Sequence, residues 1–183
     1  HGEVALFWAM IFSSIVSIGT LVAPGIVALM SGEAGDASAP APGEKRPALI
    51  FFHGGSRRQM LLGYHYRHFY HMAYAVDQWL ASQGYIVMSV NYRSGVGYGR
   101  SFRTAANTGG RGNSEYGDVL AAGKFLQGRP DVDPKRIGIW GLSYGGVLTA
   151  HALARNSDIF IDGADLTGVH LLGISLDTNA VSY

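Results

Sequence analysis

Residues 141–145 read GLSYG and fit the pattern G-x-S-x-G, which sets a serine between two glycines. In this pattern a strand ends in a sharp, strained turn, a helix follows, and the turn pushes the serine side chain outward. Crowding in such a turn requires small residues two positions either side of the serine, where Gly141 and Gly145 stand. A serine presented in this way suits a nucleophile in acyl transfer, so Ser143 is the candidate catalytic residue.

The sequence on both sides of Ser143 supports this interpretation. Residues 136–140 are mostly apolar and predict a strand, and a helix is predicted after the serine. The helix is indicated by residues at helical spacing, namely Val147, Ala150, His151 and Ala154. It would direct its free backbone N–H groups and its positive end at the serine. A serine that only caps a helix is the alternative, and the strand, the two glycines and the helix together disfavour it.

A second motif lies earlier in the chain, where residues 53–55 (HGG) follow the apolar run of residues 48–52. Acyl transfer needs hydrogen-bond donors for the oxyanion that develops on the substrate. One donor in this kind of site is the backbone N–H after the nucleophile, here Tyr144, and the other comes from the loop after an earlier strand. Residues 53–55 stand where that loop is expected, and glycines let the backbone approach a substrate oxygen closely. The alternative is a plain glycine-rich turn.

Strands and helices are predicted to alternate from residue 48 onward. Strands are predicted at residues 48–52, 85–90 and 136–140 and within residues 159–168. Residues at helical spacing predict two helices between them, around Met72, Val76, Trp79 and Leu80 and around Tyr116, Val119, Leu120 and Leu126. Gly84 is expected to end the first helix, and the glycine-rich residues 93–111 are expected to form a long loop. The alternation predicts an α/β fold with a mostly parallel sheet and helices on both faces.

The first 47 residues differ from the rest of the chain. Residues 4–30 contain no charged side chain, so the apolar segment at residues 1–30 is long enough to span a bilayer or to act as an export signal. We favour membrane association or export over a buried soluble segment, and with it an exported, periplasmic or membrane-anchored protein. Residues 31–47 are rich in Ala, Gly, Pro and Ser and predict a linker to the domain expected at residues 48–183.

Composition excludes some kinds of site. The chain has no cysteine, which rules out disulfides, thiolate zinc sites and cysteine nucleophiles. Its formal net charge of +1 indicates no nucleic-acid partner. His65, His68 and His71 are spaced by three residues, but partly buried imidazoles are favoured there over a metal site. Nothing in the sequence sets the oligomeric state.

Four sequence blocks within residues 46–168 resemble the catalytic domain of the prolyl oligopeptidase family of serine peptidases. They are residues 46–55 (RPALIFFHGG), residues 84–99 with their NYRSG and GYG segments, residues 131–140 (DVDPKRIGIW) and residues 141–146 (GLSYGG). The resemblance implies an α/β-hydrolase fold and acyl transfer to Ser143, followed by hydrolysis by water. It also implies short peptides as substrates, no cofactor and no metal. The implied oxyanion donors are Gly55 and Tyr144, and the supporting residues are His53, Gly54, Gly141 and Gly145.

Two features depart from the family. Members usually carry a β-propeller before the hydrolase domain, and the residues before position 46 do not look like propeller blades. The acid and the histidine of the triad should follow the serine on later strands, and we expect those C-terminal strands to be missing from this chain. None of the following residues is expected to replace them: His53, His151, His170, Asp162, Asp165 and Asp177. The chain alone is therefore expected to be inactive or nearly so, although the longer protein is expected to be an enzyme.

Two other functions stay open. A carboxylesterase or lipase of the same fold often has a third glycine after His-Gly-Gly, where this chain has Ser56. A non-catalytic interaction module of hydrolase-like fold would fit the missing triad residues and the apolar first segment. The sequence sets neither the preferred substrate residue nor the choice between exo- and endopeptidase action.

Overall fold

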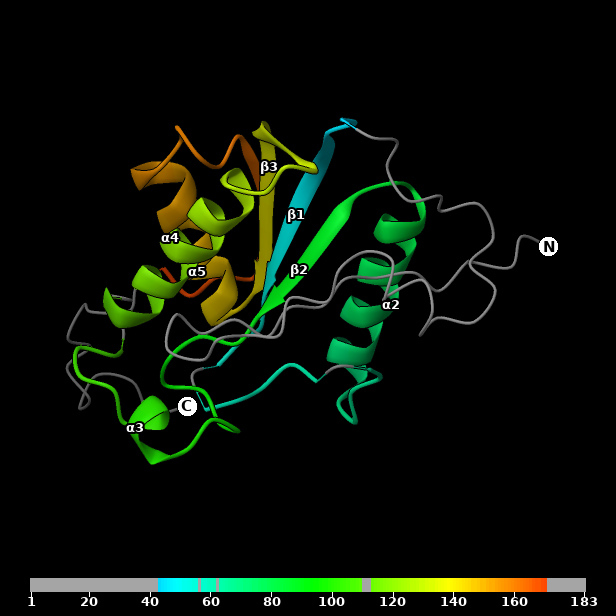
Figure 1. Cartoon of the computed structure of the whole chain (residues 1–183). Coiled ribbons are helices and arrows are strands. Elements are labelled where there is room, and N and C mark those ends of the chain that lie inside the picture. The colour runs from blue at the N-terminus through cyan, green and yellow to red at the C-terminus, as the bar shows by residue number, and fades with distance from the viewer. Residues whose placement is uncertain (1–42, 56, 62, 110–112, 171–183) are drawn as a thin grey trace.

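A computed structural model of the chain describes residues 43–55, 57–61, 63–109 and 113–170 (Figure 1). The apolar segment predicted at residues 1–30 and most of the predicted linker lie outside the described residues. Within the described ranges, no helix is both long enough and apolar enough to cross a membrane. The elements in chain order are β1 (Arg46–Phe52), α2 (His68–Ser82), β2 (Ile86–Val90), α3 (Arg100–Arg103), α4 (Asn113–Gln127), β3 (Val132–Leu142), α5 (Tyr144–Arg155) and β4 (Asp162–Leu166).

The four strands form one parallel sheet in the order β2-β1-β3-β4. Ile50 of β1 is paired with Met88 of β2 on one side and with Ile139 of β3 on the other. Parallel neighbours need crossover connections, and the helices supply them. Figure 1 shows α2 on one side of the sheet and α4 and α5 on the other. The predicted α/β fold with helices on both faces is therefore confirmed.

Side chains of β1 alternate between two cores. Ile50 and Phe52 belong to the larger buried cluster, which packs between the sheet and helices α4 and α5. Phe51 points the other way and joins a smaller cluster with Tyr70 and Ala73 of α2. The side chains of Ile50, Phe51 and Phe52 are all fully buried. Strand β1 therefore lies at the centre of the fold, and its carboxyl end is covered on both faces of the sheet.

Helix α2 forms where the sequence predicted a helix, but three of the four residues that indicated it are largely exposed. Met72, Val76 and Trp79 are 50%, 41% and 49% exposed. The buried face of α2 consists of Tyr70, Ala73, Tyr74, Asp77, Gln78 and Ala81. Two stripes at helical spacing run along this helix, and periodicity alone does not tell which one faces the sheet. The stripe with small and hydrogen-bonding residues is the one that packs.

Two elements differ from the sequence prediction. Strand β3 is longer than the predicted residues 136–140 and carries a bulge, because the two-residue step from Arg46 to Ala48 on β1 matches a five-residue step from Val132 to Ile137 on β3. Pro134 lies within that bulge, where a missing N–H costs no ladder bond. The predicted loop at residues 93–111 contains the short helix α3. Strand β4 lies at the edge of the sheet and is mostly exposed.

Candidate active site

Ser143 occupies a sharp turn between β3 and α5 with a strained backbone. Its φ is +55° and its ψ is −113°, a conformation that residues with a side chain rarely adopt. Its N–H donates to the Leu166 carbonyl at 2.8 Å, which ties the turn to the end of β4. Its carbonyl accepts the N–H of Val147 at 3.1 Å and so begins helix α5. Backbone bonds on both sides therefore hold the strain in place.

The two glycines that flank Ser143 are required by close backbone contacts. A Cβ added to Gly145 would lie 2.1 Å from the Phe52 carbonyl oxygen, and a Cβ added to Gly141 would lie 2.5 Å from the Gly145 carbonyl group. Both distances are far below van der Waals contact. The turn at Ser143 consequently rests directly on the end of β1, which brings residues 53–55 to the serine.

Residues 53–55, the candidate oxyanion loop, lie against the serine turn. A Cβ on Gly54 would lie 2.7 Å from the Leu142 carbonyl oxygen and 3.1 Å from the Cβ of Ser143. Gly55 has a φ of +61°, and among the described residues its N–H has no backbone partner. The N–H of Tyr144 is the first of helix α5 and has no partner within the helix. Both N–H groups are thus available as donors for an oxyanion.

Two tyrosine hydroxyl groups support the oxyanion loop from opposite sides. The Tyr70 hydroxyl, from α2, accepts the Gly54 N–H at 3.0 Å and lies 3.1 Å from the Gly54 carbonyl oxygen. The Tyr92 hydroxyl, from the segment after β2, lies 2.8 Å from the His53 carbonyl oxygen and 3.0 Å from that of Gly55. The loop is therefore held in one orientation before any substrate arrives.

His53 is enclosed in the core beneath this loop. Its ring stacks on that of Tyr92 with 4.4 Å between centroids, and its Nδ1 lies 3.2 Å from the Gly54 carbonyl oxygen. Burial lowers the pKa of His53 to about 4, so the imidazole is neutral near pH 7. Its buried Nε2 has no hydrogen-bond partner among the described residues. An imidazole with so low a pKa is a weak base near pH 7, so the position of His53 fits support of the loop better than proton transfer.

The remaining candidate histidines are engaged elsewhere. His170 contacts Asp165, with 2.6 Å between Nε2 and Oδ2. His151 lies on α5, with its ring edge-on to that of Tyr116 at 6.1 Å. Within the described part of the chain, the Ser143 hydroxyl makes no hydrogen bond to any side chain. No general base for Ser143 is thus assembled from these residues.

The other acids and histidines singled out in the sequence, as far as they lie among the described residues, are not gathered into a metal centre. Asp162 accepts the N–H of its neighbour Gly163 at 2.7 Å, and Asp177 lies outside the described residues. The rings of His68 and His71 are 4.9 Å apart on α2. Over the ranges that the structure describes, no three His, Asp or Glu side chains are grouped so as to hold a metal ion.

Sequence reasoning missed the residues that hold the loop. Tyr92 was part of the Asn-Tyr-Arg block, which marked the family resemblance but carried no role. Tyr70 gave no signal beyond its place in an aromatic-rich stretch. Both act through a hydroxyl placed by tertiary packing, and no local pattern of residues predicts such a contact.

The chain was compared with known proteins. The model of the prolyl oligopeptidase family matches residues 70–174. Dipeptidyl aminopeptidase BIII of Pseudoxanthomonas mexicana is 31% identical over 144 residues, which cover 79% of this chain and 19% of that protein. The Pyrococcus horikoshii acylaminoacyl peptidase is 35% identical with a TM-score of 0.54, and the match covers 70% of this chain and 20% of that one. An acylaminoacyl peptidase in complex with Z-Gly-Gly-Phe-chloromethyl ketone is 36% identical with a TM-score of 0.56, covering 71% and 20%.

The chain spans about a fifth of the length of these relatives. The family match nevertheless covers more than half of the 183 residues and includes the serine turn. The similarity to the solved structures covers about 70% of the chain. The chain therefore belongs to the prolyl oligopeptidase family.

Proposed function

We propose that the protein containing this chain is a serine peptidase that hydrolyses short peptides through an acyl-enzyme on Ser143. The observation that carries the proposal is the strained backbone of Ser143 at the junction of β3 and α5, directly against the oxyanion loop. Strain of this kind costs stability and is concentrated at functional sites. The names of the relatives, an aminopeptidase and acylaminoacyl peptidases, favour peptides over other acyl compounds as substrates.

The geometry suits the formation of an acyl-enzyme. The Ser143 hydroxyl oxygen bonds to the carbonyl carbon of the scissile amide while its proton passes to a base. The π electrons of the carbonyl move onto its oxygen, which accepts hydrogen bonds from the N–H groups of Tyr144 and Gly55. The C–N bond then breaks, the leaving amine takes the proton, and the acyl group stays on Ser143 as an ester. Water cleaves the ester through the same oxyanion and restores the hydroxyl.

We place the base and its orienting acid outside the described residues. None of the described histidines is hydrogen-bonded to the Ser143 hydroxyl, and His170 and Asp165 are paired with each other. In this fold the acid and the histidine follow the serine in the chain. Without a base the hydroxyl is a weak nucleophile, and only a small residual activity from the oxyanion donors is expected of residues 1–183 alone.

A fluorescent fluorophosphonate probe tests the proposal, because it labels only activated serines. The full-length natural protein should be labelled and should release amines from short peptides, and its Ser143→Ala variant should do neither. Residues 1–183 alone should be labelled weakly or not at all. A full-length protein that is folded by circular dichroism but unlabelled would refute the hydrolase assignment. Labelling that persists in Ser143→Ala would place the nucleophile elsewhere.

A paired substrate set separates peptidase from esterase activity. The full-length protein is given short peptides and p-nitrophenyl esters of matched acyl groups. We expect peptide hydrolysis with kcat/KM in the ordinary enzyme range, on the order of 10⁴ M⁻¹s⁻¹ or higher. Ester hydrolysis without peptide hydrolysis would favour a carboxylesterase on the same Ser143 chemistry.

A further inference from the structure

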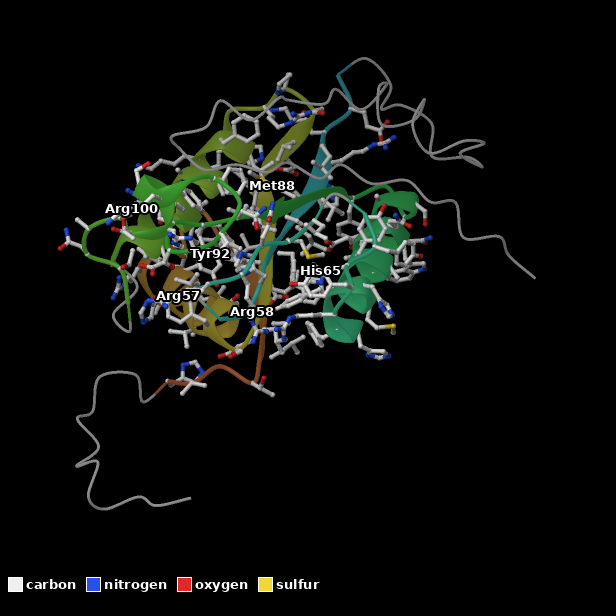
Figure 2. All side chains as sticks on the ribbon, turned by 90° about the horizontal axis from the view of Figure 1, so that it is seen from below. Arg57, Arg58, His65, Met88, Tyr92 and Arg100 are labelled. Atoms are coloured by element: carbon white, nitrogen blue, oxygen red, sulfur yellow. The ribbon has the colours of Figure 1, made fainter. Side chains whose placement is uncertain are left out.

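Three arginines line one small pocket beside the oxyanion loop. Its volume is about 130 Å³, and Arg57, Arg58, Arg67 and His65 are among its lining residues. No acidic side chain lines this cavity, the arginine pocket, in the described part of the chain. Figure 2 shows the molecule from below relative to Figure 1, with Arg57, Arg58 and His65 in the region of the loop after β1.

Among the described residues, no acidic side chain forms an ion pair with the arginines of the pocket. The ion pairs found among the described residues all involve other side chains. Guanidinium groups carry their charge at every physiological pH. Positive charges gathered in a concave site attract anions, and without an anion they repel one another. The pocket is therefore suited to an anion that the described residues do not supply.

Hydrogen bonds fix the loop that carries the arginines. The Asn91 side chain accepts the Met60 N–H at 2.7 Å and donates to the Met60 carbonyl at 3.0 Å. His65 places Nε2 3.0 Å from the Gln59 carbonyl oxygen and accepts the Arg67 N–H at Nδ1, at 2.9 Å. Burial lowers the pKa of His65, so it contributes these hydrogen bonds as a neutral ring. Hydrogen bonds thus hold the described residues next to the arginines, at positions 59, 60 and 65, and the backbone of Arg67 itself.

Arg58 joins the pocket to the oxyanion loop. A Cβ on Gly55 would lie 3.0 Å from the Arg58 Nε, and the Arg58 Nη1 donates to the Tyr70 hydroxyl at 3.3 Å. The same hydroxyl holds Gly54, which touches Ser143. The guanidinium group of Arg58 is therefore one contact away from the loop that would hold the oxyanion, and the pocket lies next to the site of bond cleavage.

We propose that the arginine pocket binds a carboxylate of the peptide substrate, close to the scissile bond. The inference rests on the proposed peptidase function and names its substrate class as peptides that carry a carboxylate close to the scissile bond. The planar guanidinium group presents two parallel N–H donors that match the two oxygens of a carboxylate. A cavity of about 130 Å³ has room for such a group but not for an extended polyanion. The carboxylate is that of an acidic side chain or of the peptide C-terminus.

A peptide set in which a single carboxylate changes position tests the pocket on the full-length protein. One arm compares Glu with Gln at successive positions on both sides of the scissile bond, and the other compares a C-terminal acid with its amide. At one position the acid should have a kcat/KM about tenfold above its amide partner, as expected for a charge-assisted hydrogen bond. The arm in which that position falls identifies the source of the carboxylate.

Arginine variants decide whether the pocket causes the preference. The acid-to-amide ratio should fall at least about fivefold in Arg57→Gln and further in the double variant with Arg67→Gln. Lys124→Gln removes one exposed charge on α4 and should leave the ratio unchanged. A ratio near one at every position, or a ratio that the arginine variants do not change, would overturn the proposal. Arg58 is left intact because it also contacts Tyr70.

A binding measurement separates this inference from the proposed function. Fluorescence anisotropy of the labelled acid and amide peptides is measured with the full-length Ser143→Ala protein. One outcome is that the natural protein cleaves no peptide, while Ser143→Ala binds the acid more tightly than the amide and loses this preference when Arg57→Gln is added. That result would support the carboxylate site and refute only the proposed peptidase function. Equal binding of acid and amide by Ser143→Ala refutes the carboxylate site whether or not peptides are cleaved.

Discussion

The Tyr70 hydroxyl lies 3.0 Å from the backbone nitrogen of Gly54 and 3.1 Å from the carbonyl oxygen of the same residue. It therefore accepts from the peptide group before Gly54 and donates to the one after it. The second of these peptide groups contains the N–H of Gly55, which we propose as an oxyanion donor. A side chain of α2 thus sets the direction in which that N–H points.

Replacing Tyr70 with Phe removes the hydroxyl and keeps the buried ring. We expect kcat to fall about tenfold with KM changed less than about twofold, because a preorganised donor acts mainly on the transition state. Peptide hydrolysis by the full-length protein gives both constants. Tyr64→Phe is the matched control, since Tyr64 is 61% exposed, and it should change neither constant. A rise in KM alone in Tyr70→Phe would show that the hydroxyl serves substrate binding instead.

Gly145→Ala should destabilise the fold as well as abolish activity. The added Cβ would lie 2.1 Å from the Phe52 carbonyl oxygen, and neither backbone segment can withdraw without moving β1 or α5. We expect a loss of about 3 kcal/mol or more in the free energy of unfolding, measured by urea titration of the full-length protein. Gly128→Ala is the control, because its nearest contact would be an ordinary 3.6 Å. Similar stability of the two variants would contradict the close packing of the serine turn on β1.

The serine turn was predictable because its constraints are local. Gly141, Ser143 and Gly145 are close in the chain, and the crowding that selects glycine arises within a few residues and the adjacent end of β1. The order of strands and helices was predictable for the same reason, since each buried strand is a continuous apolar run. The membrane or export prediction for residues 1–30 stays a prediction, because those residues lie outside the described ranges.

Contacts between distant segments were not predictable. Tyr70 and Tyr92 reach the oxyanion loop from positions 16 and 39 residues away from their partners. The buried face of α2 was also not predicted, because it contains Asp77 and Gln78. Polar residues are expected to be exposed unless a buried hydrogen-bond partner is known. The arginine pocket depends on a loop folded back by Asn91 and His65, and the sequence shows only scattered arginines.

Asp77 should make stability depend on pH. Its carboxyl is fully buried between α2 and β2, accepts the Ser89 hydroxyl at 2.8 Å, and has a pKa that burial raises from 3.8 to about 7. Between pH 3.8 and about 7, the folded state therefore keeps a proton on this carboxyl that the unfolded state has released. The stability contributed by this proton is fully present below pH 4 and is lost as pH rises through about 7.

The Asp77→Asn variant isolates this contribution. Amide and protonated carboxyl are similar in shape, so the melting temperatures of variant and natural protein should be closest below about pH 4, where the carboxyl is largely protonated in both the folded and the unfolded state. The variant should become the more stable of the two as pH rises to 8.5, because it has no proton to lose. Thermal unfolding of the full-length proteins at each pH gives the difference, and Asp158→Asn, at an exposed position, should show none of this trend. A difference that does not change with pH would refute the raised pKa.

Removing Arg93 alone from its ion pair with Asp118 should lower the stability of the fold more than removing both charges. The Asp118 carboxylate is 1% exposed and accepts the Arg93 N–H at 2.7 Å and its Nε at 3.0 Å. Arg93→Met leaves that carboxylate buried without its cation, and we expect a loss of about 3 kcal/mol in the free energy of unfolding. Adding Asp118→Asn to Arg93→Met removes the unpaired charge and should recover a large part of the loss. Urea titration of the single and double variants checks both expectations.

The exposed pair of Arg136 and Asp133 provides the comparison for this prediction. It has a similar Nε to carboxylate distance of 2.7 Å, but the Arg136 side chain is 52% exposed. Water solvates the separated charges of such a pair, so Arg136→Met should leave the unfolding midpoint nearly unchanged. An equal loss in Arg93→Met and Arg136→Met would show that burial does not set the strength of these pairs. Failure of Asp118→Asn to recover stability would show instead that Arg93 acts through its bond to the Ser114 carbonyl, at 2.9 Å.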